Sequence, residues 1–115
     1  MVGPLLAHPD GTRLVAVFGY RLVVWDAATG RRVAEPANPD GKRHFTGAAF
    51  HPSGRWLVTS GNDAAVRVWD AATWRPAQTF TWDVGKVKSV AYSPDGLLAA
   101  AGGDKGKIVV WDVDG

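Results

Sequence analysis

The sequence has no cysteine and no long run of charge or of apolar residues. Without cysteine the chain can form neither a disulfide nor a thiolate metal site. No run of like charge exceeds three residues and the net charge is +2, so the composition gives no support for nucleic-acid binding. The amino-terminal "MVGPLLAHPDG" has neither a basic region nor a long apolar stretch, which predicts no signal peptide and no membrane span. We expect a soluble, cytoplasmic protein.

A sustained helical period is also missing, and the abundant residues favour strands joined by tight turns. Hydrophobic residues make up 46% of the 115 residues and charged residues 21%, which is the balance of a small globular domain. Glycine occurs 14 times and tryptophan 6 times. Glycine permits tight turns, and tryptophan supplies large packing surfaces on the strands between them.

Two markers recur along the chain in the same phase. A Trp-Asp pair occurs in "VVWDAATG" at 23–30, "VRVWDAAT" at 66–73 and "IVVWDVDG" at 108–115. A proline turn occurs in "AHPDG" at 7–11, "FHPSG" at 50–54 and "YSPDG" at 92–96. The tryptophans are 44 and 42 residues apart, and the prolines are 43 and 42 apart. Two independent markers in step indicate a structural repeat.

Each repeat is predicted to form antiparallel strands. "GAAFHPSGRWLVTSG" places a Pro-Ser-Gly turn between two apolar runs, and "AAVRVWD" alternates between two faces. "RPAQTFTW" is more polar and suits an outer edge. We therefore expect four strands per repeat, labelled a to d. The last repeat has no strand d in the sequence, which makes eleven strands in an all-β fold.

With "SPDG" and "SGNDAAVRVWD", the repeats resemble the WD40 family over nearly the whole chain. The resemblance implies blades of a β-propeller, which are four-stranded antiparallel sheets set around an axis. We expect a single WD40-repeat region over 1–115 with three blades, at about 3–37, 45–81 and 86–113. The last blade lacks its outer strand.

In WD40 blades the tryptophan of strand c joins a hydrogen-bonded set with a Ser or Thr of strand b, an Asp of the b–c turn and a His before strand a. By position, the second blade matches this set at Trp69, at Asp63 and at either Thr59 or Ser60. The histidine is missing, and Lys105 stands at the Asp position of blade three. The resemblance thus implies blades held more by packing than by polar links. It also implies that the Trp-Asp pairs are architectural: Trp25 and Asp26, Trp69 and Asp70, and Trp111 and Asp112.

The residues that could carry chemistry have simpler structural interpretations. His8 and His51 could be a metal-ligand pair, but they occupy the same turn of different blades, where capping of the local backbone is the simpler role. "GGDKGK" at 102–107 resembles a phosphate loop only faintly, because a strand rather than a helix is expected after it. The aspartates recur in turns, and no nucleophile stands with a base. We predict no metal, no cofactor, no catalytic residue and no enzymatic activity.

Candidate contact residues are those that interrupt the repeat. Trp74 stands in a turn where blade one has Gly30. Trp56 lies on strand b, and Trp82 lies in the loop between blades two and three. An exposed tryptophan often anchors a protein contact, and packing against a neighbouring turn is the alternative for each. The loops of one face also carry basic residues that acidic neighbours nearly cancel: Lys42, Arg43, Lys86 and Lys105.

Three blades cannot close a propeller, which needs roughly four to eight. Two open faces and an unpaired strand would remain, and exposed apolar surfaces of that kind favour association. We predict a non-enzymatic protein–protein interaction scaffold completed by self-association of two or three chains. The alternative is a fragment or accessory sensor domain of a larger WD40-containing signalling protein, a kinase or NTPase. The protein or peptide partner is left open.

Overall fold

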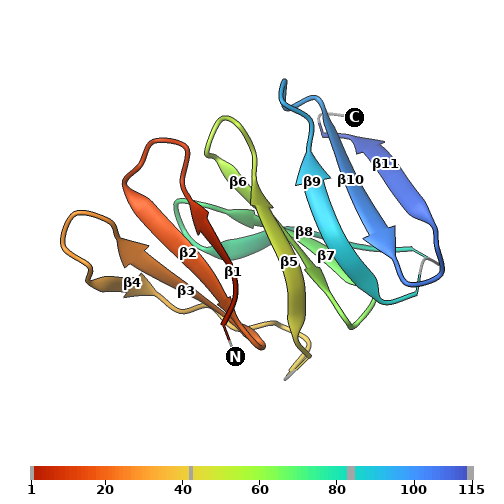
Figure 1. Cartoon of the computed structure of the whole chain (residues 1–115), viewed down its shortest axis with the longest axis horizontal. Coiled ribbons are helices and arrows are strands. Elements are labelled where there is room, and N and C mark those ends of the chain that lie inside the picture. Colours follow the sequence, from red (N-terminus) through yellow and green to blue (C-terminus); the bar gives the residue numbers. More distant parts are fainter. Residues whose placement is uncertain (1, 42, 83–84, 114–115) are drawn as a thin grey trace.

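The chain folds into three antiparallel sheets that stand side by side (Figure 1). The structure is a computed structural model, and it describes residues 2–41, 43–82 and 85–113. Those residues form eleven strands and no helix, which confirms the predicted all-β fold. We name the sheets blades one, two and three in chain order.

Blades one and two have four strands each, and blade three has three. Blade one holds β1 (Val2–Ala7), β2 (Arg13–Phe18), β3 (Arg21–Asp26) and β4 (Arg32–Ala34). Blade two holds β5 (Phe45–Phe50), β6 (Trp56–Gly61), β7 (Ala65–Asp70) and β8 (Arg75–Thr81). Blade three holds β9 (Val87–Tyr92), β10 (Leu98–Gly103) and β11 (Ile108–Asp112). In every blade, strands that follow one another in sequence are neighbours in the sheet.

The proline turns join the first strand of each blade to the second. Each ends in a glycine with a positive φ of 77°, 78° or 75°, at Gly11, Gly54 and Gly96. Glycine adopts this conformation at no steric cost because it has no Cβ. The glycine amide closes the turn by donating to the carbonyl oxygen three residues earlier, at 2.8–2.9 Å. The repeated proline–glycine step is therefore a repeated hairpin.

The strand register gives each residue of one blade a counterpart in the next. Three residues lie opposite one another in each blade: Ala7, Leu14 and Trp25; Phe50, Leu57 and Trp69; and Tyr92, Ala99 and Trp111. Because side chains alternate along a strand, each blade turns one set toward the preceding blade and the other toward the following one.

Two apolar clusters fill the junctions between blades. The first packs blade one against blade two and contains Val15, Val17, Leu22, Val24, Phe45, Leu57, Trp69 and Trp74. The second packs blade two against blade three and contains Val58, Val66, Val68, Val87 and Ala101. The core is thus divided between the two junctions, and it depends on neighbouring blades covering each other.

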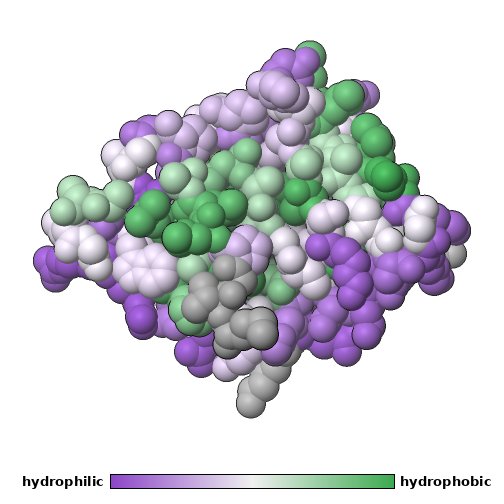
Figure 2. Space-filling view, in the orientation of Figure 1, coloured by the Kyte–Doolittle hydropathy of each residue, from purple (hydrophilic) through white to green (hydrophobic). Residues whose placement is uncertain are grey.

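Blade three has an open face and an open edge. Among the described strands, β11 pairs with β10 alone, so the predicted lack of an outer strand is confirmed. Val66 and Val68 of blade two are 0% and 8% exposed, whereas their counterparts Ile108 and Val110 are 73% and 59% exposed. Figure 2 shows apolar surface on the side of the molecule formed by β10 and β11.

Candidate interaction surfaces

Trp69 is held by one side-chain hydrogen bond in the junction between blades one and two. Its indole Nε1 donates to Thr59 Oγ1 at 2.9 Å, and both residues are 1% exposed. Phe45 meets the indole edge-on, with ring centroids 6.1 Å apart. Of the two hydroxyls considered from the sequence, the structure therefore selects Thr59. The counterparts of Thr59 in the other blades, Ala16 and Ala101, have no hydroxyl to accept such a bond.

Ser60 takes part in a link to the following blade. Its Oγ lies 2.8 Å from Thr46 Oγ1, and Thr46 donates to the carbonyl oxygen of Val87 at 2.6 Å. Thr46 is the extra residue of a bulge near the start of β5. The bulge thereby aims a hydroxyl at the neighbouring blade.

Asp63 forms a buried ion pair within blade two. Its Oδ2 lies 2.9 Å from Arg67 Nη1, and the two side chains are 1% and 8% exposed. Its Oδ1 accepts from the Ala65 amide at 3.3 Å. Removing one partner of such a pair would leave a buried charge uncompensated. The structure therefore places Asp63 in the framework of the turn between β6 and β7.

The recurring aspartates are engaged in turns. Asp26 accepts from the Ala28 amide and Asp70 from the Ala72 amide, each at 2.8 Å. At the proline turns, the Thr12 hydroxyl lowers the pKa of Asp10 and the Ser93 hydroxyl lowers the pKa of Asp95. Within the described ranges, no cluster of three or more His, Asp or Glu residues could hold a metal ion.

The two proline-turn histidines cap their own turns, as predicted: Nδ1 of His8 accepts from the Asp10 amide at 3.1 Å, and Nδ1 of His51 accepts from the Ser53 amide at 3.0 Å. Sequence reasoning missed their second role, which is to link successive blades. Nε2 of His8 lies 2.8 Å from the carbonyl oxygen of Gly54, and Nε2 of His51 lies 2.9 Å from that of Gly96. A carbonyl only accepts, so Nε2 carries the proton in both. A Cβ on Gly54 or Gly96 would lie 2.5–2.6 Å from the histidine ring, so glycine also makes room for the link. The histidine recurring in phase with the next turn's glycine was the available signal.

The three candidate contact tryptophans differ in exposure. Trp74 is 9% exposed and meets Phe50 edge-on in the first cluster, so it is not an exposed contact residue. The turn after β7 folds the indole back over the junction, and its φ of 58° at Trp74 matches the positive φ of Gly30 in blade one. Trp82 is half-buried, and its ring centroid lies 5.0 Å from that of Trp111. Trp56 is half-buried beside the second junction.

The candidate basic residues form no single strong patch among the residues described. Arg43 and Lys86 line a shallow hollow of about 190 Å³ with His44 and Asn62. Arg43 donates to the Asn62 carbonyl oxygen at 3.3 Å. Lys105 is exposed in the turn before β11, and Lys42 lies outside the described residues. No helix long and apolar enough to cross a membrane occurs in the described part of the chain.

Residues 37–70 and 74–112 match the family model of the WD domain, G-beta repeat. The Protein LST8 homolog of Drosophila melanogaster is 31% identical over 114 residues, which cover 97% of this chain and 36% of that protein. The WD repeat-containing protein VIP3 of Arabidopsis thaliana is 34% identical over 128 residues, covering 98% and 39%. The crystal structure of the RRP9 WD40 repeats matches with a TM-score of 0.89 at 18% identity, covering 98% and 36%. The chain thus spans less than two fifths of the length of these proteins.

Proposed function

Because the chain belongs to the WD40-repeat family, we propose that it is a non-enzymatic scaffold whose open faces are covered by further blades. WD40 repeats are a protein-interaction scaffold type, and members of the family are generally non-enzymatic. The units of the scaffold are the three blades at about 3–37, 45–81 and 86–113. Its aspartates are occupied in turns, which supports a structural role. We further propose that it acts in the cytoplasm.

The open face of blade three carries this proposal. Ile108 and Val110 repeat the apolar chemistry of Val66 and Val68, which blade three buries. Leu98 is 42% exposed on the same face. The exposed face of blade three has the same apolar chemistry as the face of blade two that another blade covers. We therefore expect another blade to cover it as well.

We propose a second or third copy of the chain as the source of the covering blades. Blade one of one copy would meet blade three of the next in a head-to-tail contact, which closes if the rotations sum to a full turn. Two copies would supply about six blades, within the usual range. A longer polypeptide is the second candidate source, because the curated relatives extend well beyond the matched segment.

Sedimentation equilibrium over a range of concentrations tests self-association. We expect a mass two or three times the 12.3 kDa of the chain. Val110→Lys should return the protein to monomer, because a charge on this face cannot be covered without desolvation. Val33→Lys is the matched control, since Val33 is 46% exposed but lies on β4. A folded monomer at every concentration would overturn self-association and favour the longer polypeptide.

A further inference from the structure

The two histidines of the proline turns make similar contacts with the blade that follows each of them. In both, Nε2 donates to a glycine carbonyl oxygen of the next proline turn, at 2.8 Å for His8 and 2.9 Å for His51. Their rings also pack alike, because His8 meets Phe50 edge-on at 5.1 Å between ring centroids and His51 meets Tyr92 at 5.0 Å. The two links differ at the other ring nitrogen, Nδ1.

The Nδ1 atom of His8 faces a carboxylate. Asp10 Oδ1 lies 2.7 Å from it, which is a hydrogen-bonding distance. A neutral ring whose proton is on Nε2 has only a lone pair at Nδ1, and two atoms that only accept repel each other at this separation. A second proton on Nδ1 turns the contact into a charge-assisted hydrogen bond between an imidazolium and a carboxylate. Protonation of His8 therefore adds a bond to the turn of blade one.

The Nδ1 atom of His51 faces a hydroxyl instead. Ser53 Oγ lies 2.8 Å away and can donate its proton to an unprotonated Nδ1, so the neutral ring is already satisfied. In both turns, protonation of Nδ1 deprives a backbone amide of its acceptor. The carboxylate of Asp10 offsets that loss in blade one, whereas blade two offers only a neutral oxygen. Protonation of His51 therefore weakens the turn of blade two.

The other charged groups around His8 leave Asp10 as the partner of its ring. Arg13 lines the same hollow of about 420 Å³ between blades one and two, and its Nη1 lies 3.6 Å from Asp26 Oδ2. Across the junction, blade two presents the uncharged ring of Phe50. The side chain of His8 is only 14% exposed, so its ion pair is screened less by salt than a fully exposed pair.

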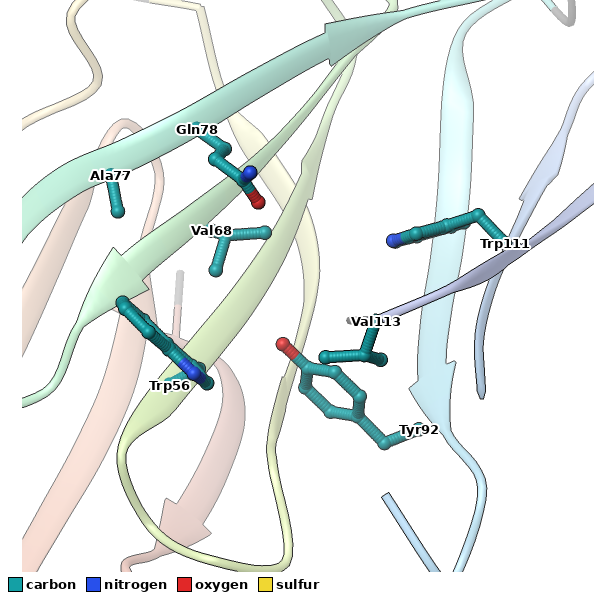
Figure 3. Close-up of a pocket in the computed structure, with 7 residues that line it drawn as sticks. All are labelled: Trp56, Val68, Ala77, Gln78, Tyr92, Trp111 and Val113. Carbon is teal, nitrogen blue, oxygen red and sulfur yellow. The ribbon is translucent and has the colours of Figure 1, made fainter. Parts of the chain in front are cut away.

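The other ionisable groups around His51 supply no opposite charge. Figure 3 shows Tyr92, which meets the ring edge-on, on the wall of a hollow of about 320 Å³ between blades two and three. Burial raises the pKa of Tyr92 to about 12, so this neighbour stays neutral. Arg55 lies over the Trp56 ring and has the same sign of charge as an imidazolium. Asp95 accepts hydrogen bonds from its own turn, and no carboxylate of the described residues forms an ion pair with His51.

We propose that the two links respond oppositely to acid: protonation of His8 strengthens the junction between blades one and two, and protonation of His51 weakens the junction between blades two and three. Histidine is the side chain that changes charge between about pH 5 and about pH 8. The gain at His8 is therefore present at the acid end of this range and is lost as the pH rises, and the loss at His51 has the same pH range. Acidification thus changes how firmly blade three is held to the rest of the scaffold. The proposal goes beyond the scaffold function, because it concerns only the two junctions within the chain.

Single variants test the opposite signs. Glutamine keeps an N–H donor but cannot take up a proton in this range, so His8→Gln and His51→Gln remove only the response to acid. Urea titrations at about pH 8 and about pH 5.5 give the unfolding equilibrium constant, at a protein concentration where sedimentation gives the same mass at both pH values. On acidification, the loss in His8→Gln should grow by about twofold to fivefold and the loss in His51→Gln should shrink. A change of the same sign in both variants would overturn the proposal.

A double-mutant cycle tests the assignment to Asp10. It compares the parent, His8→Gln, Asp10→Asn and the double variant at the same two pH values. We expect a coupling between the two residues of about twofold to fivefold in the unfolding equilibrium constant at about pH 5.5, which disappears at about pH 8. Equal coupling at both pH values would contradict a role for the imidazolium.

Exchanging the side chains of the two turns tests the cause of the difference. Ser53→Asp gives blade two the carboxylate of blade one, so acid should now strengthen the link at His51. Asp10→Ser gives blade one the hydroxyl and should abolish the gain at His8. Ala28→Asp adds a carboxylate to an exposed turn without a histidine and is the matched control, which should keep the pH dependence of the parent. If Ser53→Asp also kept that pH dependence, the proposal would be wrong.

Discussion

The junction between blades one and two and the junction between blades two and three have the same backbone arrangement. They differ in the side chains that pack between the blades. Both have a histidine from one proline turn bonded to a glycine carbonyl of the next, and both align their strands in the same register. The first junction adds the Thr59–Trp69 hydrogen bond and the buried Trp74. The second has Ala101 at the position of Thr59.

This difference shows that the repeated residues set how blades meet, while a residue that differs between the repeats changes how the tryptophan of the third strand is held. Trp69 and Trp111 occupy the same register position, yet Trp69 is fully buried and Trp111 is only half-buried. The hydroxyl that accepts from Trp69 has no equivalent beside Trp111, because Ala101 stands at that position.

Trp69→Ala should have the largest effect on stability. Deleting a fully buried indole leaves a cavity, so we expect a loss of about 4–5 kcal/mol in the free energy of unfolding. Urea titration followed by circular dichroism measures this. Trp111→Ala is the comparison, and it should cost clearly less because Trp111 retains solvent exposure. Equal losses in the two variants would contradict the difference between the junctions.

Trp74→Ala should come next, with a loss of about 3 kcal/mol in the free energy of unfolding. Urea titration followed by circular dichroism measures this loss. No measurable loss would contradict the burial of Trp74 in the first junction.

Thr59→Val should destabilise the protein by about 1–2 kcal/mol, because it keeps the shape of the side chain but leaves Trp69 Nε1 buried without an acceptor. The measurement is again urea titration. The effect should be absent from a Trp69→Phe background, where no N–H remains. Additive losses in the double variant would show that the two residues are not coupled.

His8→Ala and His51→Ala should each cost about 1 kcal/mol, because each removes one hydrogen bond between blades. The two losses should be similar, since this link is common to both junctions. His44→Ala serves as the control because His44 is exposed and lies outside the proline turns. If only one of the two variants lost stability, the histidine link would not contribute equally to the two junctions.

The smallest effect should be acid sensitivity at the proline turn of blade three. The Ser93 hydroxyl lowers the pKa of Asp95 below its ordinary value of 3.8. The stabilisation from this carboxylate is therefore present above pH 3.8 and is lost as the pH falls through the lowered folded pKa. Thermal melts between about pH 5 and about pH 2 should show a shallower pH dependence for Asp95→Asn than for the parent. Identical slopes would rule out this contribution.

The repeat architecture was predictable because it depends on local chemistry. Proline followed by glycine specifies the hairpin at 9–11, 52–54 and 94–96, and alternation around the Trp-Asp pairs specifies the third strand of each blade. From these features follow the eleven strands, the three sheets and the strand edge that ends the third.

The filling of the junctions was not predictable from any local pattern. Trp74 stands in a turn that resembles an exposed one, and only the arrival of Phe50 and Ala34 around it decides that it is buried. His8 caps its own turn through Nδ1, as its local sequence predicts, but only the fold places Gly54, 46 residues away, beside its Nε2.

By itself, the sequence determined the strands, their turns and the number of blades, because turn dihedrals and side-chain alternation are set by residues a few positions apart. Only the tertiary structure decided which tryptophan is buried and which hydroxyl accepts from Trp69. Those outcomes depend on contacts between residues of two different blades. Because the contacting residues are far apart in the sequence, no local pattern predicts which of them will meet.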